Sequence, residues 1–320
     1  MRWLIFVLLC CWVHVPVQAQ GLKYALIAKS VDDDNFIDAW RGCQKIAELH
    51  GDECALLGPT GPASPRSQAR AVRSAIEADQ YDVLAISVTD SEFIAASVAG
   101  SKVPIITFDS PFASTEAQHA LRYVGIDNVD YGIRLGELAK SFFPNGGTVC
   151  LMTAANDSNL AQRIAGVRQA LAGQPKSYGS QRLQGINGWK EHPRCPWNNN
   201  DSLRQTLNQY ALTIQQLKPD LFISVGSWPL IDSEKFDARV SSVPFNERKT
   251  ISVMSIGKVT PAMHTFLQKE YIHALLSINF YQIGEESAKA MRSIALQQAS
   301  SMEAIEIKKI LKRDVTSNEQ

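Results

Sequence analysis

The segment YALIAKSVDDDNFIDAWRGCQKIAELH (residues 24–50) combines the two patterns that decide the fold. Its first five residues form an unbroken apolar run, which is typical of a strand covered on both faces. Over about residues 35–50, apolar side chains then recur at three- to four-residue spacing, which predicts a helix: Phe36, Trp40, Cys43 and Ala47. Three consecutive acidic residues lie between the strand and the helix.

The same unit recurs along the chain. Further apolar runs alternate with helical patterns, at residues 54–58, 83–88, 104–108, 123–127, 148–153, 221–226, 250–256, 273–278 and 305–311. Such alternation predicts βαβ units and parallel sheets, and therefore the α/β class. The chain is long enough for roughly two domains, so we expect two doubly wound parallel sheets. A single (β/α)₈ barrel of the same length is the alternative.

The first nineteen residues predict the compartment. They carry Arg2, an apolar core of about residues 3–15 and Val17-Gln18-Ala19, a pattern typical of a cleaved secretory signal peptide. We therefore expect an exported chain that begins near Gln20. The formal net charge is zero, which argues against nucleic-acid binding, because such binding depends on concentrated positive charge.

Four of the six cysteines follow the predicted signal peptide, in an oxidising compartment. Cys43 lies on the apolar face of the first helix and Cys54 opens the next strand, so a short-range disulfide between them is predicted. A Cys150–Cys195 disulfide is left open and is the less favoured pairing, because Cys150 lies inside an apolar strand and also suits the core.

Polar side chains follow the predicted strands at their carboxyl ends, where open parallel sheets bind ligands. They include Asp32–Phe36, Ser87–Asp90, Asp109, Asn156–Asn159, Gly226–Trp228 and Gly257-Lys258. Carboxylates and amides bond hydroxyl groups, and flat rings cover the C–H faces of a sugar, so the set suits a neutral polyhydroxylated solute. A simpler reading remains open for several of them, because Asp and Asn are also preferred helix caps.

Enzyme and metal motifs are absent from the sequence. It has no glycine-rich phosphate loop and no G-x-S-x-G elbow, and its histidines lack paired ligand spacing. Residues 32–34 resemble part of a Ca²⁺ loop but lack its glycine and closing Glu. The sequence therefore predicts a binding protein with no cofactor, metal or catalytic group.

Four stretches together resemble one family: ALIAKSVDDDNFIDAWRGCQKIA, VPIITFDSP, YVGIDNVDYGIRLGELA and NLAQRIAGVRQAL with its R-x-x-G. The chain resembles the type I periplasmic solute-binding proteins, in their ribose-binding-like, sugar-binding branch. The resemblance implies two parallel-sheet lobes joined by three crossing strands, with the ligand between them. The implied bounds are residues 1–19 for the signal peptide, 20–126 plus 279–303 for the N-terminal lobe, and 127–278 plus 304–320 for the C-terminal lobe.

The resemblance also implies a set of ligand-binding residues: Asp33, Asn35, Phe36, Asp109, Asn159, Arg163, Trp228 and Asn279. Residues 185–201 resemble an insertion of some sugar-binding relatives, in which Trp189 would supply a stacking ring. Ser110 stands where the ribose binder has an arginine, so ribose itself is not implied.

The function implied is capture of a small polyhydroxylated solute in the periplasm by hinge closure. The monomeric protein would deliver the solute to the membrane permease of an ABC-type importer. A ligand-binding subunit that signals to a membrane sensor histidine kinase is the alternative.

Overall fold

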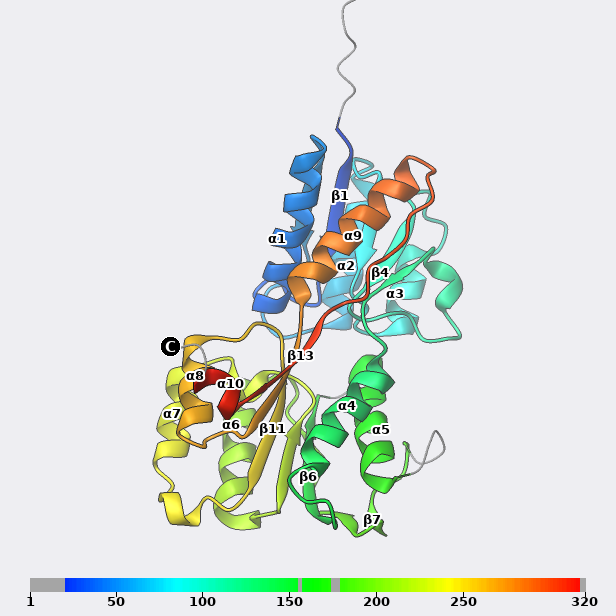
Figure 1. Ribbon diagram of the computed structural model, residues 1–320. Helices are drawn as coiled ribbons and strands as arrows, with labels where there is room; N and C mark the ends of the chain where they lie inside the picture. Colours follow the sequence, from blue (N-terminus) through cyan, green and yellow to red (C-terminus); the bar gives the residue numbers. More distant parts are fainter. Residues whose placement is uncertain (1–20, 155–156, 174–178, 317–320) are drawn as a thin grey trace, which may run out of the picture.

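The computed structural model describes residues 21–154, 157–173 and 179–316, so the predicted signal peptide lies outside the described residues. Its two lobes each contain one sheet (Figure 1). The two sheets exclude the single barrel and confirm the predicted α/β architecture. Within the described residues, no helix is long and apolar enough to cross a membrane.

The N-terminal lobe is built on a five-stranded sheet of order β2-β1-β3-β4-β5 in which every pair is parallel. Its strands are β1 (Lys23–Ile27), β2 (Glu53–Leu57), β3 (Val83–Ile86), β4 (Ile105–Phe108) and β5 (Tyr123–Val124). Its helices are α1 (Asp34–Leu49), α2 (Pro65–Glu77), α3 (Ser91–Val98), the 3₁₀ turn η1 (Ala117–His119) and α9 (Phe280–Ala295). Side chains of β1 alternate between two core clusters, which explains its unbroken apolar run.

The C-terminal lobe is built on an eight-stranded sheet of order β13-β12-β11-β10-β6-β8-β7, with β9 also paired to β6. Its strands are β6 (Gly147–Thr153), β7 (Gln184–Ile186), β8 (Trp189–Glu191), β9 (Trp197–Asn198), β10 (Leu221–Ser224), β11 (Ile251–Ile256), β12 (Ala274–Ile278) and β13 (Ile307–Leu311). Its helices are α4 (Asn128–Lys140), α5 (Ser158–Ala172), α6 (Leu203–Leu212), α7 (Ser233–Ser241), α8 (Pro261–Gln268) and α10 (Lys312–Thr316). Shorter turns are η2 (Thr213–Leu217, a π-helix), η3 (Trp228–Leu230) and η4 (Phe245–Glu247).

The chain crosses between the lobes three times: after β5, after β12 and before β13 (Figure 1). The returning helix α9 packs on α1, although they stand at opposite ends of the sequence. Glycine permits this contact, since a Cβ atom on Gly42 would lie 2.0 Å from the carbonyl oxygen of Tyr281. The lobe bounds implied by the sequence stay a proposal.

Two disulfides join the cysteines that follow the signal peptide. Cys43–Cys54 is present as predicted, between α1 and β2. Cys150–Cys195, the less favoured pairing that the sequence left open, is also present. The reason is tertiary: β9 pairs with the end of β6, which brings the preceding Cys195 beside Cys150 with their Cα atoms 5.3 Å apart.

Candidate functional site at the lobe interface

A buried lysine joins the two lobes. The Nζ atom of Lys29, just after β1, lies 2.6 Å from Oδ2 of Asp157 on the other lobe and 3.8 Å from Oδ2 of Asp109 on its own. Burial opposes the charge of Lys29, but the two carboxylates outweigh it and raise the pKa of its ammonium. Lys29 was not among the predicted site residues. We call Lys29, Asp109, Asp157 and their neighbours Asp33 and Asp201 the interlobe cluster.

The N-terminal lobe supplies Asp109 and Asp33 to the cluster. Asp109 adopts a φ of 56° directly after β4, is 6% exposed, and accepts a hydrogen bond of 2.9 Å from the Ser87 hydroxyl at the end of β3. Asp33 caps α1 by accepting from the backbone N–H of Asn35 at 2.9 Å. Burial raises the pKa of Asp33 to about 6, with the charges of Asp109 and Asp34 acting in the same direction. Asp33 therefore caps α1 and also lies within the interlobe cluster, while its role in ligand binding stays a prediction.

Asn35 and Phe36 also lie on this side of the interface. A Cβ atom on Gly257 would lie 1.9 Å from Oδ1 of Asn35, so Asn35 contacts the loop after β11 on the opposite lobe. Phe36 is 5% exposed and packs edge-on against Phe108 and Phe280. Its predicted place among the ligand-binding residues stays a prediction.

The first two turns of α5 supply the opposing wall. Asp157 caps this helix by accepting from the N–H of Asn159, and it uses its other oxygen for Lys29. Asn159 is 3% exposed, and its Oδ1 atom has no hydrogen-bond partner among the described residues. A buried acceptor without a donor is costly, so this atom is suited to a donor on a bound solute.

Arg163 is held in place on all sides. Its guanidinium donates to Oδ1 of Asn128 at 2.8 Å and to the carbonyl of Val225 at 3.1 Å, and it lies 4.9 Å from the ring centroid of Tyr131. The R-x-x-G motif explains this position, because a Cβ atom on Gly166 would lie 2.2 Å from the carbonyl oxygen of Val129. The glycine lets α5 approach α4 closely enough for Arg163 to reach Asn128.

Trp228 follows β10 and is half-buried, with its indole N–H donating to Oδ1 of Asp201 at 2.7 Å. Burial raises the pKa of Asp201, the charge of Asp157 adds to this, and Lys29 opposes it. Asp201 therefore lies close to the charges of Asp157 and Lys29. Sequence reasoning missed it, because it ends an inserted polar segment and follows no predicted strand.

The prediction that Trp189 stacks on a ligand is wrong. Its side chain is fully buried in the core. It lies in β8 opposite Gly147, at the amino end of β6, whereas the interlobe cluster lies beyond the carboxyl end of that strand. The indole fills the core under the inserted segment, because pairing of β8 with β6 turns it inward.

Asn279 lies apart from the cluster, at a crossing between the lobes. It caps α9 by accepting from the N–H of Gln282 at 3.0 Å and donates to Glu306 at 3.3 Å. It lines a cavity of about 310 Å³ together with Asp38, Gly257 and Lys258. A role for Asn279 in ligand binding stays a prediction, and the structure associates it with the hinge.

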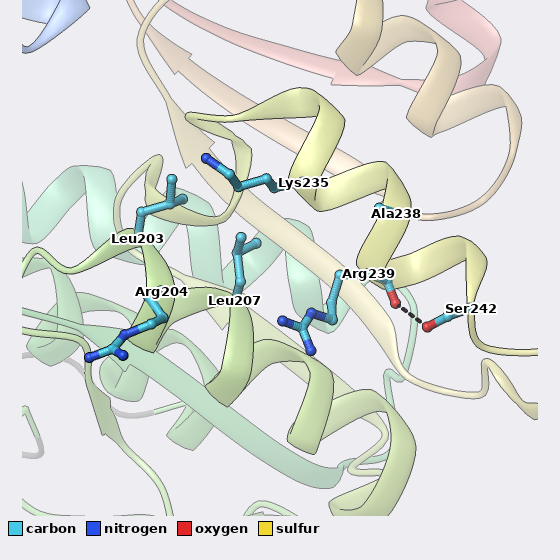
Figure 2. A pocket seen from close by; sticks show the side chains of 7 residues that line it. All are labelled: Leu203, Arg204, Leu207, Lys235, Ala238, Arg239 and Ser242. Carbon is cyan, nitrogen blue, oxygen red and sulfur yellow. Dashed lines mark hydrogen bonds between the residues drawn. The ribbon is translucent and has the colours of Figure 1, made fainter.

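A larger groove of about 680 Å³ lies on the C-terminal lobe and shares no residue with the interlobe cluster. Figure 2 shows it between α6 and α7, with an apolar floor that includes Leu203 and Leu207 and basic side chains that include Arg204.

Within the part of the chain that the structure describes, no group of three or more acidic, histidine or cysteine residues could hold a metal ion.

Comparison with known proteins assigns the family. A family model described as "Periplasmic binding protein domain" matches residues 24–299. The chain belongs to this periplasmic binding protein family. The family model thus spans both lobes and the polar residues between them. A search of curated proteins gives no match to the chain.

Solved structures share the fold of this periplasmic binding protein at low sequence identity. The glucose-galactose binding protein GanP from Geobacillus stearothermophilus is 19% identical with a TM-score of 0.75, over 92% of this chain and 98% of GanP. A solute binding protein of an ABC transporter from Agrobacterium vitis, with bound D-fucose, is 13% identical with a TM-score of 0.77, over 93% and 98% of the two chains. A XylFII–LytSN complex contains a chain that is 16% identical with a TM-score of 0.73, over 92% and 99% of the two chains.

Proposed function

We propose that this protein captures a small polyhydroxylated solute, of the sugar class, between its lobes in the periplasm and delivers it to the permease of an ABC-type importer. The observation that carries the proposal is the interlobe cluster, to which β1, β4 and α1 of one lobe and α5 of the other bring polar side chains. GanP is a glucose-galactose binding protein and the Agrobacterium vitis protein holds D-fucose, and both support the solute class.

Capture follows from contacts that exist only when the lobes meet. Asp33, Asn35 and Asp109 offer hydrogen-bonding groups from one lobe, and Asn159 offers its unpaired acceptor from the other. A solute that bonds to both sides favours the closed form through its differential contacts. Arg163 supports the second wall, and Trp228 covers the solute ring.

No turnover is proposed. Burying several polar groups is costly unless each is matched, and this cost lets a closed site reject near-analogues without any chemical step. Among the described residues, the groups proposed to meet a bound solute are carboxylates, amides and an indole ring.

A signalling role is the second candidate. One similar structure is a complex of XylFII with a second protein, LytSN, so a chain of this fold also acts in a protein complex. In that case the closed, solute-bound form would be recognised by a sensor kinase in the membrane. The solute-binding step would be the same in both.

Isothermal titration with neutral monosaccharides, disaccharides and polyols tests the proposal. We expect saturable binding of one solute per chain, and loss of that binding in Asp109→Ala because Asp109 would be a primary acceptor. Glu234→Ala, at an exposed position of α7, is the matched control and should bind normally. Chemical products in the mixture instead of stoichiometric binding would refute the proposal.

A further inference from the structure

The inserted segment is anchored at the edge of the interlobe cluster. Cys195 is bonded to Cys150 in the middle of β6, and β9 then pairs with Met152–Thr153 at the carboxyl end of that strand. The segment that follows, Asn198–Asp201, therefore begins from a fixed point beside the interface.

The backbone of Asn198–Asp201 is held by its own hydrogen bonds. The carbonyl of Asn198 accepts from the side chains of Gln205 and Gln209, each at 2.8 Å, and the N–H of Asn199 donates to the carbonyl of Thr153 at 3.0 Å. The side chain of Asn199 accepts from the N–H of Asp201 at 2.9 Å. Asp201 itself adopts a φ of 53°, a conformation that costs energy and persists only where surroundings impose it.

These hydrogen bonds fix the carboxylate of Asp201 beside Trp228. Oδ1 of Asp201 orients the indole of Trp228 through the 2.7 Å hydrogen bond, and no hydrogen bond reaches Oδ2 from the described residues. Asp201 contributes nothing to capping of the helix that follows, since the cap of α6 is Ser202. Its position serves the interface.

Beside the interlobe cluster, hydrogen-bond acceptors are left without a partner among the described residues. The two cations nearest the interlobe cluster are engaged: Lys29 by Asp157 and Asp109, and Arg163 by Asn128 and Val225. Acceptors remain, namely Oδ1 of Asn159 and Oδ2 of Asp201. A solute that enters such a site must donate hydrogen bonds, and a carboxylate or phosphate on it would meet like charge.

We propose that Asp201 is a specificity-determining residue, which selects donor-rich neutral or amino-substituted sugars and rejects sugar acids, and which also orients Trp228 over the solute. This inference rests on the proposed function. The inserted segment would then have a role: the Cys150–Cys195 disulfide fixes it so that Asp201 lies at the interlobe cluster.

The test uses the neutral, amino and uronic forms of glucose, galactose and mannose, titrated into the full mature chain. The wild type should bind at least one neutral or amino form and none of the uronic acids. Asp201→Asn keeps the size and one acceptor but removes the charge. It should lower the affinity for the best ligand about tenfold, as expected for loss of a charge-assisted hydrogen bond. It should also reduce the ratio between the affinities for that ligand and for its uronic form.

Two further variants keep the test decisive if Asp201→Asn is poorly folded. Trp228→Phe keeps a ring but removes the donor to Asp201, and it should weaken binding without admitting uronic acids. Glu234→Gln, at an exposed position of α7, should change neither affinity nor ranking. Unchanged affinity and ranking in Asp201→Asn, or tight binding of a uronic acid by the wild type, would overturn the inference while the proposed function stands. Absence of saturable binding by the wild type to any sugar would instead refute the proposed function.

Discussion

The ammonium of Lys29 and the carboxylate of Asp157 meet at 2.6 Å across the lobe interface, although 128 residues separate them in the chain. Both side chains are largely buried. Removing only one partner of a buried ion pair destabilises the protein strongly, because the other partner is left as an uncompensated buried charge. This pair therefore links the two lobes directly.

Lys29→Met should open the protein that has no solute bound. The methionine fills similar space but leaves Asp157 unpaired, so we expect a larger radius of gyration by small-angle X-ray scattering and a stability loss of about 3 kcal/mol. The control is Lys258→Met, since Lys258 is exposed and lies 4.0 Å from Asp38 in a second contact between the lobes. An identical scattering curve for Lys29→Met and wild type would contradict the role of the pair.

Asp33 should make stability depend on pH. Its folded pKa of about 6 lies above the ordinary value of 3.8, so the folded protein binds a proton that the unfolded chain does not bind between these pH values. The contribution of Asp33 to the free energy of unfolding therefore increases as pH falls from about 7 to about 4.

Asp33→Asn isolates this contribution, because asparagine also caps helices well. We expect the variant to be more stable than the wild type at pH 7, and this advantage to shrink at pH 5. Urea unfolding of both proteins at the two pH values measures it. A stability difference independent of pH would show that Asp33 is not held in an unfavourable charged state.

The two disulfides should differ in the stability they provide. Cys150–Cys195 joins cysteines separated by 45 residues and Cys43–Cys54 by 11. In the chain-entropy model, removing the first pair as a double Ala variant should cost about 4 kcal/mol and removing the second about 3 kcal/mol. Urea unfolding of the two double variants gives the comparison, and a larger loss for the short loop would go against the model.

Trp189→Ala should reduce stability without changing the affinity of the folded protein for its solute. Truncating a fully buried aromatic residue costs about 3–5 kcal/mol. Unfolding experiments measure the loss, and titration at a temperature where the variant remains folded measures affinity. A large loss of affinity with stability unchanged would restore Trp189 to the binding site.

Periodicity was enough to predict most elements, because buried parallel strands are continuously apolar and helices repeat every three to four residues. Helix α7 was missed, since it buries only Phe236 and Val240 and so has almost no apolar pattern. Strands β7, β8 and β9 are two or three residues long, too short for a period to be recognised.

Asp109 and Asn159 could be found from sequence because each follows a strand at its carboxyl end. Lys29 was missed at the same kind of position, because a charged residue after a strand resembles an ordinary loop residue until its partners are known. Asp201 gives no local signal at all, since the pairing of β9 with β6 alone brings it to the interface.

The sequence by itself determined the α/β class, the two lobes and the side of each sheet that carries polar groups, because these follow from local periodicity and from where strands end. Only the tertiary structure decided which groups meet. The contact of Lys29 with Asp157, the bond of Cys150 to Cys195 and the inward turn of Trp189 all join segments far apart in the chain. Such contacts depend on how sheets and lobes pack, and no local pattern of residues encodes that.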